Sequence, residues 1–175
     1  MESVGYRSKG MEAALIKKIR AVWLLIACIA FALPALTVLA PVLREGGYDS
    51  ISTYIYRGFG FLCHQLADRS FHLMSQPLAV CARCFGLYLG LFIGVIAFPF
   101  IQSVRNEKPL SRTLLFVSMI PMGIDWGLGA LGIWENSHVS RFLTGLIAGT
   151  VCALFITSGA IEIIQIKARR EDISI

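Results

Sequence analysis

Four long apolar segments limit what this chain can fold into. They cover residues 21–43, 80–101, 113–134 and 141–164. Each is long enough to cross a bilayer, which takes about 20 apolar residues in a helix. Because a segment inside lipid must satisfy its backbone hydrogen bonds internally, a helix is the expected form of each one. The sequence therefore predicts an all-α membrane protein built as a four-transmembrane-helix bundle.

Composition supports a membrane protein and leaves little room for anything else. Hydrophobic residues make up 56% of the 175 residues and charged residues only 15%, whereas soluble domains average about 25% charged residues. Four spans with short connections nearly use up this length, so we expect no second soluble domain. The net charge is +5, but Lys and Arg flank the apolar segments instead of gathering on one polar element. We therefore expect the lipid bilayer, and no nucleic acid, as the partner.

The distribution of Lys and Arg predicts the orientation of the spans. Eleven of them lie in the N-terminal segment, between the second and third spans and in the tail, against five on the other side. Basic residues concentrate on the cytoplasmic side of a membrane. We expect a multi-pass protein of the plasma membrane, with residues 1–20 and 166–175 in the cytoplasm and residues 21–165 as the transmembrane domain.

The first apolar segment has a second interpretation, as a secretory signal that is removed. Its small-residue cleavage site would then be Val38-Leu39-Ala40. The apolar run is longer than a signal core of about 7–15 residues, which favours an uncleaved anchor. Cleavage of this segment stays open.

The longest connection, residues 44–79, is more than a plain loop. After turn-forming residues it continues as a stretch rich in aromatic residues, with too few apolar ones to cross the membrane. Tyr54, Tyr56, Phe59 and Phe61 suit a helix at headgroup level, where aromatic rings are favoured. We expect a partly helical extracytoplasmic loop folded over the mouth of the bundle.

The second span combines a packing face with a reactive face. Gly86, Gly90 and Gly94 repeat at every fourth position, and such a ridge lets another helix backbone approach closely in lipid. At 3.6 residues per turn, Cys81 and Cys84 fall on nearly the opposite face. We expect the glycine face to pack and the other face to present thiols.

Cysteine and histidine concentrate just before this span. Cys81 and Cys84 form a C-x-x-C, whose sulfurs lie about one helical turn apart and can share one metal ion or one disulfide. Upstream, Cys63 and His64 supply another thiol and an imidazole, with His72 as an alternative nitrogen ligand. A set of three Cys and one His suits Zn²⁺, or another transition metal such as iron in different surroundings.

The same thiols allow a different chemistry. On the outer face they can oxidise, Arg83 favours the thiolate form, and Cys63 can resolve a disulfide between Cys81 and Cys84, as in a membrane thiol–disulfide oxidoreductase. A third class is a non-catalytic membrane subunit or a transporter. With one candidate intramembrane acid and no pair of broken helices, the sequence offers little support for transport.

Asp125 and Arg141 form a second group of polar residues. An ionised carboxylate inside a span needs a partner or water, because leaving it unpaired costs about 2.5–3.5 kcal/mol. Arg141, at the start of the fourth span, is the expected partner. Two roles stay open, a structural clamp between the third and fourth spans and a site role for Asp125 as base, ligand or substrate contact.

Two motifs, CHQ-x3-RSF and C-A-R-C-x-G-x-Y-x-G, resemble those of a family of small, mostly bacterial and archaeal integral membrane proteins, domain of unknown function 2085. The resemblance extends to the Asp125 helix and to Arg141-x-x-Thr144-Gly145. It implies a shared outer-face site without naming a reaction. The residues that carry it are Cys63, His64, Gln65, Arg69, Ser70, Phe71, Cys81, Arg83, Cys84, Gly86, Tyr88 and Gly90.

A catalytic use of this end follows from the same residues. If the metal site is catalytic, metal-activated water acting on a lipid-derived or small anionic substrate is the simplest chemistry. Asp125 then serves as the base, and Arg69 or Arg141 contacts the anion. A purely structural metal site is the alternative, so whether the protein is an enzyme stays open, as does its oligomeric state.

Overall fold

The protein is mainly helical, with one short two-stranded hairpin, in the part that the computed structural model describes, residues 9–101 and 111–173, which confirms the expected all-α membrane fold. The first eight residues, the basic connection over 102–110 and the last two residues lie outside this part. The elements are α1 (Lys9–Glu45), α2 (Asp49–Gly60), a 3₁₀ helix (Ala67–Arg69), β1 (His72–Leu73), β2 (Gln76–Pro77), α3 (Ala82–Ile101), α4 (Arg112–Ala130) and α5 (His138–Ile173).

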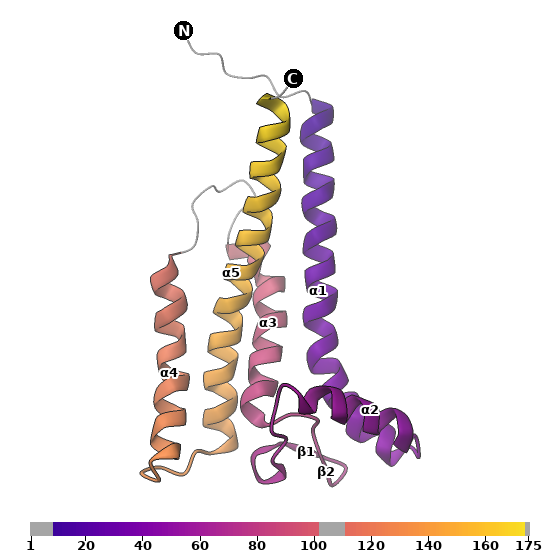
Figure 1. The fold of residues 1–175 in the computed structure, drawn as a ribbon, viewed down its shortest axis with the longest axis vertical. Coiled ribbons are helices and arrows are strands. Elements are labelled where there is room, and N and C mark those ends of the chain that lie inside the picture. Colours follow the sequence, from indigo (N-terminus) through magenta and orange to yellow (C-terminus); the bar gives the residue numbers. More distant parts are fainter. Residues whose placement is uncertain (1–8, 102–110, 174–175) are drawn as a thin grey trace.

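Among the described helices, α1, α3, α4 and α5 are long and apolar enough to cross a membrane. With 37 and 36 residues, α1 and α5 reach about 55 Å, well beyond a hydrocarbon core of about 30 Å. Both extend past α3 and α4 at the end where the termini lie (Figure 1). α1 starts before residue 21 and α5 continues past residue 164, because the flanking Lys, Arg, Glu and Ala residues favour helix as well.

The closest contact in the bundle joins α3 to α5, and glycine makes it possible. A Cβ atom at Gly86, Gly90 or Gly94 would overlap the backbone of α5, and one at Gly145 or Gly149 would overlap the backbone of α3. Backbones that approach this closely gain dispersion contacts that lipid does not supply, since lipid tails are as apolar as Leu. The predicted glycine ridge of the second span is confirmed.

A proline in α3 helps to attach α1. Pro99 has no N–H group, so the carbonyl of Val95, one turn earlier, lacks its helical partner. The indole Nε1 of Trp23 on α1 donates a hydrogen bond to this oxygen at 2.9 Å. The same bond therefore satisfies a backbone group inside the bundle and fixes α1 against α3.

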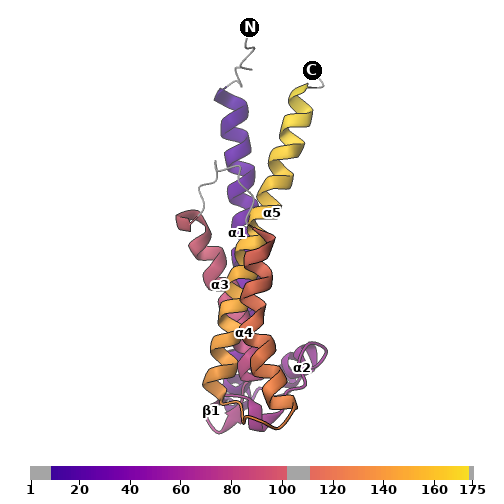
Figure 2. The same ribbon diagram turned by 90° about the vertical axis from the view of Figure 1, so that its left-hand side faces the viewer.

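The end opposite the termini carries α2, the hairpin and the α4–α5 connection (Figures 1 and 2). α2 lies across the end of α1, and the buried Ser52 hydroxyl donates to the carbonyl of Ala40 at 2.8 Å. Phe59 is buried on the inner side of α2, while Tyr54 is 72% exposed on the other side. The helix expected in the long loop is therefore present, with one buried face and one exposed face.

α4 is the most loosely packed of the four long helices. Its single buried residue in the described structure is Ser118. The helix ends at Ala130, short of the expected residue 134, because Gly132 adopts a left-handed backbone with φ of +68°. The N–H of Ile133 then reaches back to the carbonyl of Leu128 at 3.1 Å, which closes the helix end.

Candidate metal centre

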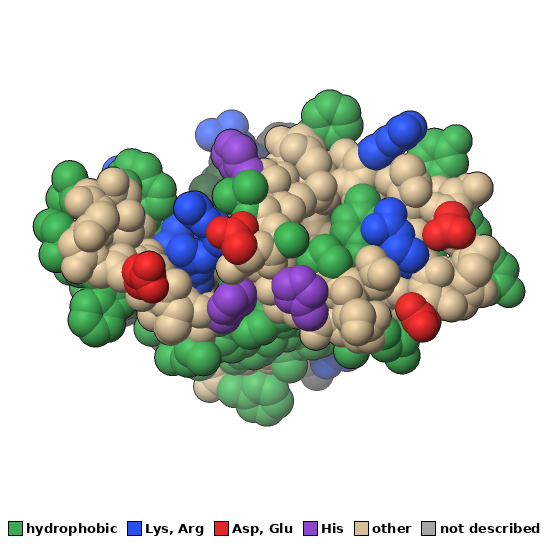
Figure 3. All heavy atoms as spheres, turned by 90° about the horizontal axis from the view of Figure 1, so that it is seen from below, with side chains coloured by type: hydrophobic (Ala, Val, Ile, Leu, Met, Phe, Trp, Pro, Cys, Tyr) green, Lys and Arg blue, Asp and Glu red, His purple; other side chains and the backbone are tan. Residues whose placement is uncertain are grey.

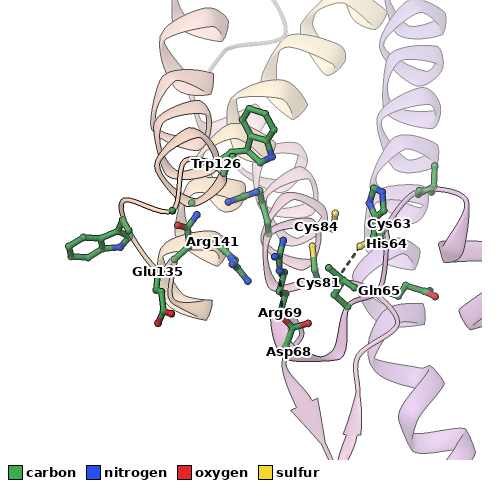
Figure 4. Close-up of a pocket in the computed structure, with 18 residues that line it drawn as sticks. Cys63, His64, Gln65, Asp68, Arg69, Cys81, Cys84, Trp126, Glu135 and Arg141 are labelled. Atoms are coloured by element: carbon green, nitrogen blue, oxygen red, sulfur yellow. Dashed lines mark hydrogen bonds and ion pairs between the residues drawn. The ribbon is translucent and has the colours of Figure 1, made fainter.

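Three cysteines from two separate parts of the chain meet at the end opposite the termini. The sulfur atoms of Cys63, Cys81 and Cys84 all lie within 4.8 Å of one another, and we call this group the thiol cluster. All three are free thiols; Cys63 is buried, and the other two are half-buried. The predicted meeting of Cys63 with the C-x-x-C is confirmed (Figure 4).

Gln65 holds the first cysteine in place. The chain leaves α2 through a tight turn in which the N–H of Cys63 donates to the carbonyl of Phe59 at 2.9 Å. Gln65 then adopts a left-handed backbone with φ of +51°. Its side-chain amide donates both to the carbonyl of Tyr56 at 2.6 Å and to that of Ala79 at 2.8 Å. One side chain thus ties α2 to the segment that leads into Cys81.

A proline in α1 anchors this leading segment from the other side. Because Pro41 has no N–H group, the carbonyl of Thr37 is free of its usual helical bond. The N–H of Ala79 donates to that oxygen at 3.3 Å. Ala79 and Val80 are both fully buried as a result. The backbone that precedes Cys81 is therefore fixed on α1 as well as on α2.

The hairpin between the two cysteine segments is held by aromatic packing. β1 and β2 pair antiparallel around Met74 and Ser75, which both have positive φ, the backbone of a type I′ turn. Just before β1, the ring of Phe71 lies 6.2 Å from that of Phe85 on α3 and 5.8 Å from that of Phe142 on α5. These contacts fix the hairpin to α5 and to α3, the helix that carries Cys84 of the C-x-x-C.

The thiol cluster has the features of a ligand set for a soft metal. A Zn–S bond of about 2.3 Å puts the sulfurs of a tetrahedral site about 3.8 Å apart. The three sulfurs, which lie within 4.8 Å of one another, therefore need to move only slightly closer together. The backbone N–H of Cys81 donates to Cys63 Sγ at 3.3 Å. Hydrogen bonds from the thiols of Cys63 and then Cys84 lower the pKa of Cys81, so this thiol favours the thiolate form.

The expected histidine ligands lie outside this set. His64 follows Cys63 in the chain and lines the adjoining cavity, but its nitrogens are not among the atoms that meet within 4.8 Å. His72 lies in β1 and is exposed. His138 stacks at 5.8 Å on Phe71. Among the described residues, only the three thiols converge closely enough to share one ion.

The prediction that Arg141 pairs with Asp125 was wrong. Its carboxylate pairs with Arg83, from the first turn of α3, and not with Arg141. Arg83 is the central basic residue of the C-A-R-C motif, and its side chain is 20% exposed. The face of α3 that turns toward α4 puts this guanidinium beside the acid, whereas Arg141 turns toward the cavity.

Two further residues complete the environment of Asp125. Asn136 Nδ2 donates to the Oδ2 atom at 3.0 Å and also to the backbone carbonyl of Asp125, and Ser140 Oγ donates to Oδ1 at 2.7 Å. We call Asp125, Arg83, Asn136 and Ser140 the carboxylate cluster. No role was assigned to Asn136 or Ser140 from the sequence. Both residues lie within two positions of His138, where α5 begins, and this place in the sequence was the available signal. The short connection from α4 brings the start of α5 back to Asp125.

A cavity of about 890 Å³ adjoins the thiol cluster. Cys63, Cys81 and Cys84 form one wall, and the α4–α5 connection forms another (Figure 4). Arg69 and Arg141, both predicted to contact an anion, line it, whereas Asp125 does not. Seen from this end, histidine, basic and acidic side chains lie among apolar ones (Figure 3).

Comparison with known proteins bears out the resemblance. A family model described as predicted membrane protein (DUF2085) matches residues 63–155, from the first cysteine of the thiol cluster into α5. An uncharacterized protein of Methanocaldococcus jannaschii is 37% identical over 117 residues, 67% of this chain and 75% of that protein. An uncharacterized protein of Methanothermobacter thermautotrophicus is 34% identical over 91 residues, 52% of this chain and 80% of that protein. No solved structure matches.

Proposed function

The chain belongs to the DUF2085 family of predicted membrane proteins, and we propose that it binds a transition metal, most simply Zn²⁺, on Cys63, Cys81 and Cys84. The observation that carries the proposal is the convergence of three free thiols on one point beside a cavity. Soft thiolates favour Zn²⁺ over Mg²⁺ or Ca²⁺, which prefer oxygen ligands.

An ion held by the three sulfurs would take its fourth ligand from the adjoining cavity, which all three cysteines line. His64 lines the cavity next to Cys63 and completes a Cys₃His set if its imidazole turns toward the sulfurs. If it does not, the position takes water. A zinc ion with three protein ligands and one water is the usual catalytic arrangement, and zinc deaminases use three thiolates in this way.

The open position supports hydrolysis of a lipid-derived or small anionic substrate. The ion, if held by the thiol cluster, would supply an activated water for cleaving an ester bond; His64 is the cavity residue suited to take the proton of that water and return it to the leaving alcohol, and Arg69 or Arg141 holds the anion. Asp125 keeps Arg83 in place in this scheme, because its oxygens already accept bonds from Arg83, Asn136 and Ser140. We assign the protein to the plasma membrane, and the distribution of Lys and Arg supports an orientation with both termini in the cytoplasm and the site outside.

Metal analysis of the full-length protein, purified anaerobically, tests the binding proposal. We expect about one equivalent of metal, and three cysteines that resist alkylation until a chelator removes it. Metal well below one equivalent, in protein whose cysteines are quantitatively disulfide-bonded, contradicts the proposal. Hydrolysis of phospholipid vesicles by metal-loaded but not by chelator-treated protein tests the catalytic part.

One observation favours a second candidate, a membrane thiol–disulfide oxidoreductase. The carbonyl of Cys81 accepts the first helical hydrogen bond of α3, from the N–H of Phe85 at 2.9 Å. Cys81 is thus the N-cap of the helix, a position that stabilises a thiolate. This candidate requires a C-x-x-C that cycles with a dithiol reductant and a Cys84→Ser variant that traps a mixed disulfide. Thiols that never oxidise, with metal bound, exclude it.

A further inference from the structure

We infer that the cavity beside the thiol cluster binds the phosphate of an anionic membrane phospholipid. The inference deepens the proposed function, since it names the class of substrate or ligand that reaches the open side of the metal. It rests on three features of the described structure: the basic side chains of the cavity, the apolar side chains around it, and its position at one end of the spans.

The basic side chains come from two different walls of the cavity. Arg69 ends the 3₁₀ helix, and Arg141 lies in the first turn of α5 (Figure 4). Within the described residues, the Arg69 side chain has one ion-pair partner, the exposed Asp68 at 3.6 Å, and solvent screens this pair. Arg141 has no ion-pair partner among the described residues. Arg83 also lines the cavity, but Asp125 already neutralises it.

Two guanidinium groups that flank one space suit a phosphate. Arg presents a planar fork of donors that matches phosphate oxygens, often with two bonds from one side chain. The cavity, of about 890 Å³, is far larger than one ion needs and is in the range of pockets for whole small molecules. It can therefore hold a headgroup together with the atoms that join it to a lipid.

The apolar side chains around the cavity indicate that the anion is attached to a lipid. Leu62, Trp126 and Trp134 line it and are 66%, 63% and 63% exposed. Phe61, next to Leu62, is 91% exposed. Trp is enriched at the level of lipid headgroups, where its ring meets both apolar and polar surroundings. A soluble anion uses none of these surfaces, whereas acyl chains cover them.

Tryptophan fluorescence gives a direct readout, because two of the three tryptophans line the cavity. The full-length protein with Trp23→Phe is reconstituted in phosphatidylcholine nanodiscs, and brominated phosphatidylglycerol is titrated in as a quencher. We expect saturable quenching at low mole fractions, and only proportional quenching with brominated phosphatidylcholine. Equal quenching by both lipids overturns the inference.

The double variant Arg69→Gln/Arg141→Gln tests the arginines. We expect the apparent affinity for phosphatidylglycerol to fall about tenfold or more, since each charge-assisted hydrogen bond is stronger than a neutral one. Arg57→Gln is the matched control, because Arg57 is an exposed arginine on α2 that does not line the cavity. An unchanged affinity in the double variant, or an equal loss in the control, contradicts the inference.

Inorganic phosphate distinguishes the two sources of the anion. If free phosphate at millimolar concentration displaces the brominated lipid completely and binds equally well without lipid, the cavity takes a soluble anion and the lipid assignment is wrong. Metal content is measured on the same samples. Lipid selectivity without metal contradicts only the proposed function, and metal without lipid selectivity contradicts only this inference.

Discussion

The thiol cluster and the carboxylate cluster lie at the same end of the bundle, and both include residues of α3. They differ in how many hydrogen-bond or ion-pair partners their polar atoms already have. In the carboxylate cluster, both oxygens of Asp125 accept bonds, from α3, from the α4–α5 connection and from α5. In the thiol cluster, three sulfurs face one another and a cavity, and the hydrogen bonds that they accept come from backbone N–H groups and from one another.

This difference separates the roles of the two clusters. A polar group inside a membrane protein is costly unless it is paired, so a saturated carboxylate stabilises the fold and has little capacity left for a ligand. Three adjacent free thiols have donor capacity left, which an ion can use. Cys81, Arg83 and Cys84 lie within about one helical turn at the start of α3, so this short segment contributes residues to both clusters.

The largest effect is expected from breaking the thiol cluster. Cys84→Ser should weaken metal binding by more than about 100-fold, since losing even an outer partner of a metal ligand costs 10–100-fold. Metal analysis of the purified variant measures this. Cys152→Ser is the matched control, because Cys152 lies on α5 outside the cluster and should keep the full metal content. Full metal content in Cys84→Ser would contradict metal binding by the thiol cluster.

Breaking the carboxylate cluster should act on stability instead. Asp125→Ala leaves the half-buried Arg83 without its counter-charge, and we expect the free energy of unfolding to fall by about 3–5 kcal/mol. Denaturant unfolding in detergent micelles measures it. The double variant Arg83→Met/Asp125→Leu should recover most of the loss while the metal content stays unchanged. A double variant as unstable as Asp125→Ala would show that the ion pair does not act as a clamp.

A smaller effect should follow from loosening the support of the thiol cluster. Gln65→Leu removes the amide that joins the carbonyls of Tyr56 and Ala79, so Cys63 is no longer fixed against Cys81. We expect metal affinity to fall about tenfold, measured by competition with a chromophoric chelator. His72→Gln, in the exposed hairpin, should leave the affinity unchanged. Equal affinities in both variants would contradict a positioning role for Gln65.

The smallest effect should come from trimming the carboxylate cluster. Ser140→Ala removes one hydrogen bond from Asp125 but leaves the ion pair with Arg83, so we expect a loss of about 1.5 kcal/mol in unfolding free energy. The same detergent unfolding assay applies. A loss as large as that of Asp125→Ala would mean that Ser140, and not Arg83, is the main partner of the carboxylate.

The sequence was sufficient for the features that depend on hydrophobicity and spacing. Apolar length predicted the four spans, and the four-residue repeat of Gly86, Gly90 and Gly94 predicted the face that packs on α5. The joint occurrence of Cys63 with the C-x-x-C predicted the thiol cluster, because few other residues in the chain suit a soft metal. These inferences needed only local periodicity and residue chemistry.

The sequence was insufficient to predict which side chains on different helices contact each other. Arg141 was the expected partner of Asp125 because it stands at the start of the next span, but the rotation of α3 and α4 brings Arg83 to the acid. The hairpin was missed for a related reason. Its turn uses Met74 and Ser75 at positive φ instead of the Asn and Gly that normally mark such turns.

X-ray absorption at the metal edge, on the full-length protein as purified, shows whether the three thiols bind a metal. We expect three sulfur scatterers at about 2.3 Å and one nitrogen or oxygen at about 2.0–2.1 Å, with the sulfur signal reduced in Cys63→Ser. A shell made only of nitrogen and oxygen, or protein with intact thiols and no metal, would contradict this expectation.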